Sequence, residues 1–176
     1  MNSKAVNTLN YTGIVTLSQY VGNNKVQLAQ IHNTGGTSLF NFLASCLAGH
    51  FQYASVNWPT KIKLLDYAVD GSEYTYESVS GFIFLRTAPE IISTDTGECR
   101  VRYSFTVPRD TLENAVNTIT KSLGIGLYTH GASGDELADF AAFCEINSDF
   151  SLNTLVNATL LVDWELVIAN AGTKIS

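Results

Sequence analysis

The chain has 176 residues, of which 45% are hydrophobic and 15% are charged, and its formal net charge is −6. A domain of this length buries roughly 70% of its unfolded surface, so its core requires no disulfides or metal ions. Basic residues gather only at Lys61/Lys63 and Arg100/Arg102, and no apolar run approaches the roughly 20 residues of a membrane span, which argues against direct sequence-specific nucleic-acid binding and against membrane insertion. Typical soluble domains are about 25% charged, so the low charged fraction favours a surface partly covered by partners.

The first 33 residues predict an arm followed by a β-hairpin. Residues 1–10 show no hydrophobic period, so we expect an N-terminal arm. Residues 11–21 and 25–33 alternate between two faces, as half-buried strands do. Between them, Gly22-Asn23-Asn24 supplies residues that tolerate the positive φ of a tight turn, so we expect the two strands to pair.

The strongest helix signal in the chain covers residues 37–48. A hydroxyl residue at position 37 or 38 can cap the first turn, and Gly49 suits the left-handed position after the last turn. Between these ends only Asn41 and Ser45 are polar, and they lie four residues apart on one face. A helix this apolar is expected to be buried nearly all round and to act as the plug against which the sheets pack.

The middle of the chain predicts short strands separated by turns. The expected strands are 61–67, 74–87 and 98–107, and Ile91-Ile92 leads into a turn at 95–97. In the first of them, Ile62 and Leu64 are expected to face inward, and Lys61 and Lys63 outward. Gly81 lies inside the second and predicts a bulge there.

Two later segments fit more than one pattern. In 108–123, Asp110 with Glu113 resembles a capping box and the apolar residues fit a helical stripe, whereas the second half alternates like a strand. We expect a short turn or helical piece there, followed by a strand. After a loop at 130–135, residues 136–146 alternate cleanly and predict another strand.

These elements together predict a mainly β fold of the α+β class. Residues 155–169 alternate and form the last expected strand, and 170–176 lack a period and form a C-terminal tail. With about eight to ten strands, the fold is expected to be a β-sandwich or a partly closed β-barrel, with the helix at 37–48 buried against it. The whole chain, 1–176, is expected to be a single domain.

Two short motifs have a chemical interpretation beside a structural one. Asp95-Thr96-Gly97 is the tripeptide of aspartic proteases, in which two aspartates share a proton and activate water. It occurs once, and Asp-x-Gly between strands is also an ordinary hairpin turn. The segment 33–38 could cradle an anion at a helix N-terminus, but it lacks the lysine of a phosphate-binding loop and also fits a helix cap. The structural interpretation is favoured in both cases.

The histidines and cysteines show no ligand or nucleophile spacing. No two histidines are spaced to put two ligands on one face: they are His32, His50 and His130. The cysteines are odd in number and form no C-x-x-C pair: they are Cys46, Cys99 and Cys144. Cys46 and Cys144 lie in apolar patterns and are expected to be small buried hydrophobes, with the pKa of Cys46 raised by burial. We therefore assign no catalytic residue, no metal ligand and no cofactor, and expect a non-enzymatic protein.

Aromatic side chains gather in the region before and after the strand at 61–67. They are Phe51, Tyr53, Trp58, Tyr67, Tyr74 and Tyr76. Such a group fits a binding platform for sugar or protein. It fits a buried sheet face equally well, because strands favour aromatic residues.

Several stretches resemble structural proteins of tailed-bacteriophage virions, particularly those of crAss-like phages. One block reads IHNTGGTSLF at 31–40, followed by CLAG at 46–49 and WPTKI at 58–62. The other reads LGIGLY at 123–128, ELA at 136–138 and LLVDWEL at 160–166. The resemblance spans about two-thirds of the chain and consists of turn residues and strand patterns. It carries over no active-site residue.

The resemblance implies a β-rich subunit located in a virion that assembles in the cytoplasm of the host bacterium. The implied partners are other virion proteins, namely the major capsid protein or neighbouring ring subunits, with the chain homo-oligomeric or repeated in the assembly. A capsid auxiliary or decoration protein is favoured, because a compact chain suits a position repeated over a shell. A neck or tail ring or adaptor protein is the alternative, and a carbohydrate- or protein-binding β-sandwich module is a further one.

The expected interface combines the two ends of the chain with aromatic side chains. Neither end has the periodicity to fold on its own core, so we expect at least one of them to be ordered by a neighbouring subunit, for example by addition to a sheet edge. The expected interface residues are Met1, Asn2, Ser3, Tyr11, Trp58, Tyr74, Tyr76, Lys174 and Ile175.

Overall fold

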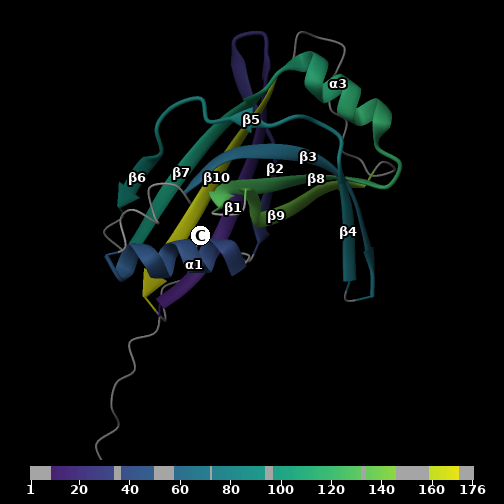
Figure 1. The fold of residues 1–176 in the computed structure, drawn as a ribbon. Coiled ribbons are helices and arrows are strands. Elements are labelled where there is room, and N and C mark those ends of the chain that lie inside the picture. The colour runs from purple at the N-terminus through teal and green to yellow at the C-terminus, as the bar shows by residue number, and fades with distance from the viewer. Residues whose placement is uncertain are drawn as a thin grey trace, which may run out of the picture.

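The computed structural model describes residues 9–33, 37–49, 58–71, 73–93, 97–131, 134–145 and 159–170. Its strands and helices follow one another along the chain as Figure 1 shows. In order they are β1 (Leu9–Val21), β2 (Asn24–Asn33), α1 (Thr37–Leu47), β3 (Pro59–Asp70), β4 (Glu73–Ser78), β5 (Ile83–Phe84), β6 (Glu90–Ser93), β7 (Glu98–Val107), α3 (Arg109–Thr118), β8 (Ser122–Gly131), β9 (Gly134–Glu145) and β10 (Leu160–Asn170).

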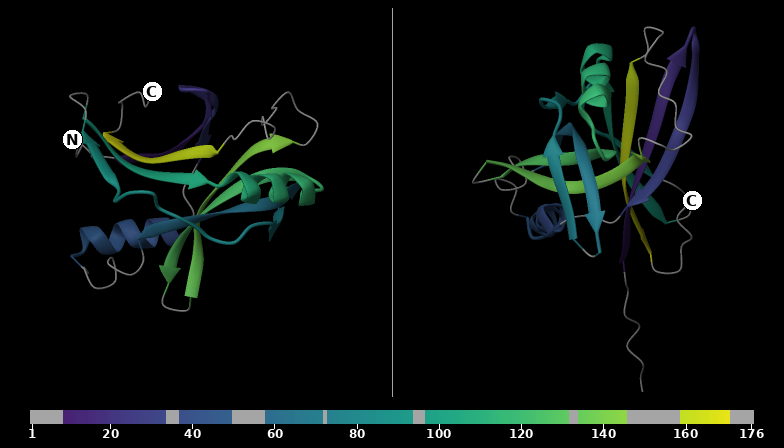
Figure 2. Two further views of the ribbon diagram at one scale, coloured as in Figure 1. Left: turned by 90° about the horizontal axis from the view of Figure 1, so that it is seen from above. Right: turned by 90° about the vertical axis from the view of Figure 1, so that its right-hand side faces the viewer.

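The strands form two antiparallel sheets that curl into a half-barrel. Sheet A has the order β2-β1-β10-β7-β6, and sheet B has the order β4-β3-β8-β9, with β5 also paired to β3. The strands of one sheet cross those of the other steeply, as Figures 1 and 2 show. The predicted mainly β class, a sandwich or partly closed barrel, is therefore confirmed.

The first and last strands pair with each other at the centre of sheet A. Their register runs from Leu9 opposite Asn170 to Gln19 opposite Leu160. Residues 9, 10 and 170 therefore belong to strands, and the predicted arm and tail are shorter than expected at those positions. The remainder of both segments, including Met1, Asn2, Ser3, Lys174 and Ile175, lies outside the described residues.

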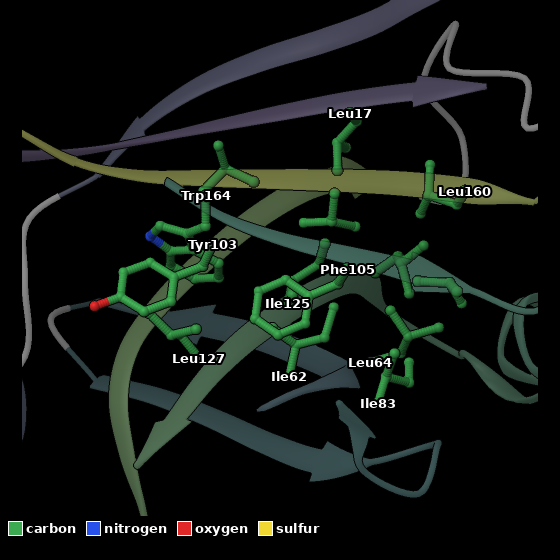
Figure 3. Close-up of a cluster of buried hydrophobic side chains, with 14 of the residues drawn as sticks. Leu17, Ile62, Leu64, Ile83, Tyr103, Phe105, Ile125, Leu127, Leu160 and Trp164 are labelled. Carbon is green, nitrogen blue, oxygen red and sulfur yellow. The ribbon is translucent and has the colours of Figure 1, made fainter. Parts of the chain in front are cut away.

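The core lies between the facing sides of the two sheets. Sheet A supplies fully buried side chains that include Leu17, Phe105 and Trp164, and sheet B supplies Ile62 and Ile125. Figure 3 shows these side chains meeting in the space between the sheets. The alternation predicted for the strands at 61–67, 98–107 and 155–169 places its apolar set inward over 62–64, 103–107 and 160–166. Cys99 is exposed although it belongs to the predicted inward set, and residues 155–158 lie outside the described residues. Packing of the inward set stabilises the fold.

The strand predicted at 74–87 is interrupted where Gly81 predicted a bulge. Its two parts, β4 and β5, pair with the same strand, β3: Ser78 lies opposite Leu65, and Ile83 opposite Ile62. Four residues, 79–82, therefore face two residues of β3. The Ser80 hydroxyl accepts a hydrogen bond from the Leu64 backbone N–H at 2.9 Å, which satisfies a group that the ladder leaves unpaired.

The segment at 108–123 contains the expected helical piece and the start of the following strand, but the strand begins at Ser122 and not at Ile119, where the alternation placed it. The capping-box prediction is wrong, because α3 begins at Arg109 with Pro108 as N-cap and no side-chain cap bond. Asp110 instead lies in the first turn, where a negative charge is favourable. After α3, the Asp66 carboxylate of β3 accepts hydrogen bonds from the backbone N–H groups of Thr120 and Lys121, which ties the helix end to sheet B.

The β8–β9 hairpin confirms the strand predicted at 136–146. The two strands pair from Ser122 opposite Glu145 to Gly131 opposite Gly134. The loop predicted at 130–135 is shorter than expected, because β8 continues to Gly131 and β9 begins at Gly134. The hydrogen-bonded ladder therefore extends into a segment whose glycines and polar residues resemble a loop in sequence.

Candidate assembly surface

Helix α1 lies against one side of the half-barrel and contacts it with one stripe of side chains. Leu39 is fully buried, and Phe42 and Leu43 pack partly buried against the core. Cys46 completes the stripe one turn later and is partly exposed. The spacing i, i+3, i+4, i+7 places these four residues on one face of a helix, so the core holds α1 through this inner stripe.

A second apolar stripe of α1 faces solvent. Phe40 is 47% exposed, Leu47 is 84% exposed and Ala44 between them is also exposed. The predicted burial of the helix at 37–48 on nearly every side is therefore wrong, although the helix itself is confirmed. The two sheets pack against each other, and α1 lies beside them and not between them, so only one side of the helix is covered (Figures 1 and 2).

The exposed stripe is continued by an aromatic side chain from sheet A. The rings of Tyr11 on β1 and Phe40 meet edge to face, with centroids 5.3 Å apart. Tyr11 is thus the member of the predicted interface that the fold brings to α1. We call the surface formed by Tyr11, Phe40, Ala44 and Leu47 the α1 patch. Beside it, the Ser45 hydroxyl donates a hydrogen bond to the Asn41 backbone carbonyl at 2.8 Å, within the helix.

The other predicted aromatic residues lie elsewhere. Trp58 packs partly buried against the core. Tyr76 is exposed on β4 and stacks on Phe140, with centroids 6.1 Å apart, and Tyr67 contacts the same ring at 4.6 Å. Tyr74 lies in β4, but its side chain falls outside the described atoms, and so do residues 51 and 53. Of the predicted interface residues whose side chains are described, Trp58 thus packs against the core, Tyr11 lies against α1 and Tyr76 lies on β4.

The outer face of sheet B carries a cluster of lysines and aromatic rings that the sequence did not reveal. The ammonium groups of Lys61 and Lys63 lie 4.3 and 4.0 Å from the ring centroid of Phe82, which the bulge at 79–82 places over them. Tyr128 meets Phe82 edge to face at 5.5 Å. Lys61 also forms an ion pair with Asp135. We call these five residues the lysine–aromatic cluster.

Two predictions about this cluster are corrected or refined by the geometry. Lys61 does face outward as expected, but it is only 7% exposed, because the Phe82 ring and Asp135 cover it. Burial, with Tyr76 nearby, raises the pKa of Tyr128 to about 12, and a hydrogen bond with Ser78 opposes that shift. Tyr128 is therefore a neutral hydrogen-bonding group at ordinary pH.

The outer face of sheet A carries a network of ion pairs. The Glu165 carboxylate accepts from Arg100 Nη1 at 2.9 Å and from Arg102 Nη2 at 2.7 Å. Arg100 also pairs with Glu98, and Arg102 with Glu90. Burial disfavours the charged form of Arg100, but its hydrogen bonds to Glu98 and Glu165 outweigh that effect and raise its pKa. Both guanidinium groups are thus engaged in holding β6, β7 and β10 together.

The structure provides no geometric support for a chemical role of the short motifs. Asp95 and residues 34–36 lie outside the described residues, and Gly97 has a φ of 79°, which suits a turn. His32 is exposed on β2, and the side chains of His50 and His130 fall outside the described atoms. Where side chains are described, no group of three or more His, Cys, Asp or Glu residues is arranged to hold a metal ion.

The cysteines differ in part from expectation. Cys46 is partly exposed and Cys99 exposed, and both are free thiols. The predicted burial of Cys46 is therefore only partial, because the inner stripe of α1 leaves the core at that turn. Desolvation nevertheless raises the pKa of the Cys46 thiol, the direction expected. The side chain of Cys144 is not among those described.

One hollow is present beside β5. It has a volume of about 300 Å³ and is lined by Gly81, Phe82, Ile83, Phe84, Thr106, Pro108 and Thr111. Its lining residues carry no ionisable side chain. Neither α1 nor α3, the helices in the described ranges, is long and apolar enough to cross a membrane.

Comparison of the chain with protein-family models, with curated proteins and with solved structures gives no match.

Proposed function

We propose that the chain is a non-enzymatic structural subunit of a tailed-phage virion, held by subunit contacts through the α1 patch. Its most favoured position is that of a capsid auxiliary protein beside the major capsid protein. The observation that carries the proposal is the solvent-facing apolar stripe of α1. The resemblance of the sequence to virion proteins supports the proposal that the assembly is a tailed-phage virion.

The stripe supports a contact because it is continuous and repeats at helical spacing. Residues 40, 44 and 47 follow one another at i, i+4 and i+7, so a partner can cover them together. Burying one large apolar side chain contributes about 1.5–3 kcal/mol relative to leaving it exposed. Phe40 and Leu47 together therefore offer several kcal/mol to a neighbouring subunit.

Mass spectrometry of purified particles tests the proposal directly. We expect the chain among the virion proteins in hundreds of copies, as a shell position requires. About a dozen copies would instead indicate a neck or tail ring, the alternative position, because rings of such size are built from few subunits. Absence from particles would refute the virion proposal.

A variant of the α1 patch tests the surface. Leu47→Lys should leave the melting temperature of the isolated chain almost unchanged, because this side chain is 84% exposed. The same variant should reduce incorporation into particles severely. Val116→Lys, at an exposed position on α3, is the matched control and should incorporate normally. Equal incorporation of both variants would remove the α1 patch from the proposal.

The lysine–aromatic cluster favours a second candidate function, a module that binds carbohydrate. The Lys63 ammonium group lies 5.6 Å from the Tyr128 ring centroid, and Tyr128 is hydrogen-bonded to Ser78. Next to the cluster, Tyr76 is exposed, and this mixture of ring faces and donors suits sugars. A glycan array separates the candidates. Binding that is lost in Tyr76→Ala, but retained in Leu47→Lys, would favour the binding module.

A further inference from the structure

Two projecting hairpins carry half of the large apolar side chains that are exposed on the described surface. The first tip, between β1 and β2, exposes Tyr20, Val21 and Val26. The second tip, between β3 and β4, exposes Val69 and Tyr76. In each hairpin the residue that directly follows the first strand is a glycine with a φ of 63°, Gly22 after β1 and Gly71 after β3. Exposed apolar residues at the ends of rigid hairpins are suited to contacts with other chains.

The two tips differ in charge. The sequence contains no Asp or Glu before Asp66, and the first tip carries Lys25 as its charged side chain. The second tip carries Asp70, Glu73 and Glu77, all exposed. None of these three carboxylates forms an ion pair within the described part of the chain. The first tip is thus apolar and positively charged, the second tip is apolar and negatively charged, and their charges are complementary.

The two tips also point in opposite directions. In Figure 1 the β1–β2 hairpin ends at the top of the molecule, and the β3–β4 hairpin ends at the lower right. The right-hand view of Figure 2 shows the same separation along the vertical axis. The two tips are therefore separate surfaces at different ends of the molecule.

We propose that the partner of the first tip is the second tip of another copy of this chain, in a head-to-tail contact. The proposal rests on the proposed function, since it names one neighbour of the subunit in its assembly. The contact pairs Tyr20, Val21 and Val26 with Val69 and Tyr76, and it brings Lys25 toward the free carboxylates. A two-fold contact between two second tips would instead bring six carboxylates together, which is unfavourable.

A head-to-tail contact of this kind has defined consequences. It uses two different surfaces, so it builds a ring or an open row rather than a closed dimer. Two hairpin tips bury less than the roughly 1,200 Å² of a stable interface, so the contact is weak between isolated copies and gains strength by repetition. Lys25 lies 3.0 Å from Asp163 but is exposed, and a surface pair of this kind leaves the ammonium open to a second carboxylate.

Disulfide trapping between purified full-length variants tests the contact. The background is Cys46→Ala with Cys99→Ser, which removes the two described free thiols. Val21→Cys and Val69→Cys are each added to this background and mixed at high concentration under mild oxidation. We expect a cross-linked heterodimer at least about tenfold more abundant than either homodimer, because the alternative pairings lack charge complementarity. The yield should fall severalfold at 1 M salt, where the screening length is about 3 Å.

Val116→Cys in the same background is the matched control, since Val116 is an exposed valine that belongs to α3 and to neither hairpin. It should cross-link with neither variant. Equal yields for all mixtures, or no heterodimer above the control, would overturn the contact. If the heterodimer is absent but the chain is found in particles, the contact fails and the proposed function stands. If the heterodimer forms and the chain is missing from particles, the contact stands and the virion proposal fails.

Discussion

The outer faces of the two sheets differ in how they stabilise the cationic side chains that lie on them. Each presents cationic side chains on alternate positions of a central strand: Arg100 and Arg102 on β7, and Lys61 and Lys63 on β3. On sheet A both cations pair with carboxylates. On sheet B both ammonium groups lie over the ring of Phe82, and Lys61 pairs with Asp135 as well, so Lys63 is the lysine that shows the contrast most clearly. β7 and β3 thus share the same alternation, and the side chains of their neighbouring segments determine how the positive charge is stabilised.

The register explains the difference. Arg102 lies opposite Glu165 on β10, so its nearest neighbour is an acid. Lys63 lies opposite Gly126 on β8, where there is no side chain at all. The space above Gly126 is filled instead by Leu65, Leu137 and Tyr128, whose atoms lie within 3.1 Å of where a Cβ would be. Because Gly126 has no side chain, apolar and aromatic neighbours occupy the space opposite Lys63, and its ammonium group lies near one of their rings, that of Tyr128.

The largest effect is expected from removing the shared acid of sheet A. Glu165→Gln leaves Arg100 and Arg102 without the carboxylate that joins them, in a position where Glu165 is buried. Breaking a buried pair by removing one partner costs about 3 kcal/mol, at the lower end of the range because Arg102 reaches solvent. Urea denaturation checks this value. Asp163→Asn, which breaks the exposed pair with Lys25, is the control and should cost about 0.5 kcal/mol.

The second prediction fills the empty position on sheet B. In Gly126→Val the new Cβ would lie 2.7 Å from Leu137 Cδ1 and 2.9 Å from Tyr128 Cε2, so the outer face must shift. Overpacking of this kind costs about 2 kcal/mol in unfolding free energy. Gly81→Ala serves as the control, because nothing lies within 4 Å of its Cβ, and it should change stability by less than about 0.5 kcal/mol. An equal loss of unfolding free energy in the two variants would contradict the assignment of the loss to overpacking above Gly126.

The third prediction concerns alkaline pH. The pKa of Tyr128 is raised by burial to about 12 from its ordinary value of 10.0, so the unfolded chain loses this proton at lower pH than the folded chain. Stability should therefore fall as pH rises from 10 to 12, with Tyr128 accounting for about 1 kcal/mol at pH 11. Tyr128→Phe should lessen that slope, measured by urea denaturation at pH 9 and pH 11. Tyr103, whose pKa burial also raises, is present in both proteins, so the difference in slope reports Tyr128 alone.

Local patterns predicted much of the fold, whereas contacts between distant segments were beyond them. The β1–β2 hairpin depends on alternation and on a turn at Gly22, all within one stretch of sequence. The pairing of Arg102 with Glu165 depends on the register between strands more than fifty residues apart, which no pattern in either strand contains. The strand predicted at 136–146 and the helical piece predicted within 108–123 are present because their periods are local, although the strand after that helix begins only at Ser122.

The site was less predictable for related reasons. Composition shows how apolar α1 is, but the number of its neighbours depends on how the sheets close, so the exposure of Phe40 and Leu47 could not be foreseen. Gly81 did signal the interruption of a strand. Where that interruption would place Phe82, however, depended on β4 and β5 sharing one partner strand. The lysine–aromatic cluster was therefore missed.

The smallest effect is expected from removing a cation of sheet B, and it tests the comparison most directly. Lys63→Met removes the ammonium group above Phe82 and Tyr128 but leaves no charge behind, since its partners are neutral rings. The lost cation–π energy, about 0.5–1 kcal/mol, is offset by the thioether, which also packs favourably on aromatic rings. We expect a net change within about 0.5 kcal/mol by urea denaturation, against the much larger loss in Glu165→Gln. A loss as large as that of Glu165→Gln would contradict the comparison, because it would mean that Lys63 neutralises an acid, as the arginines of sheet A do.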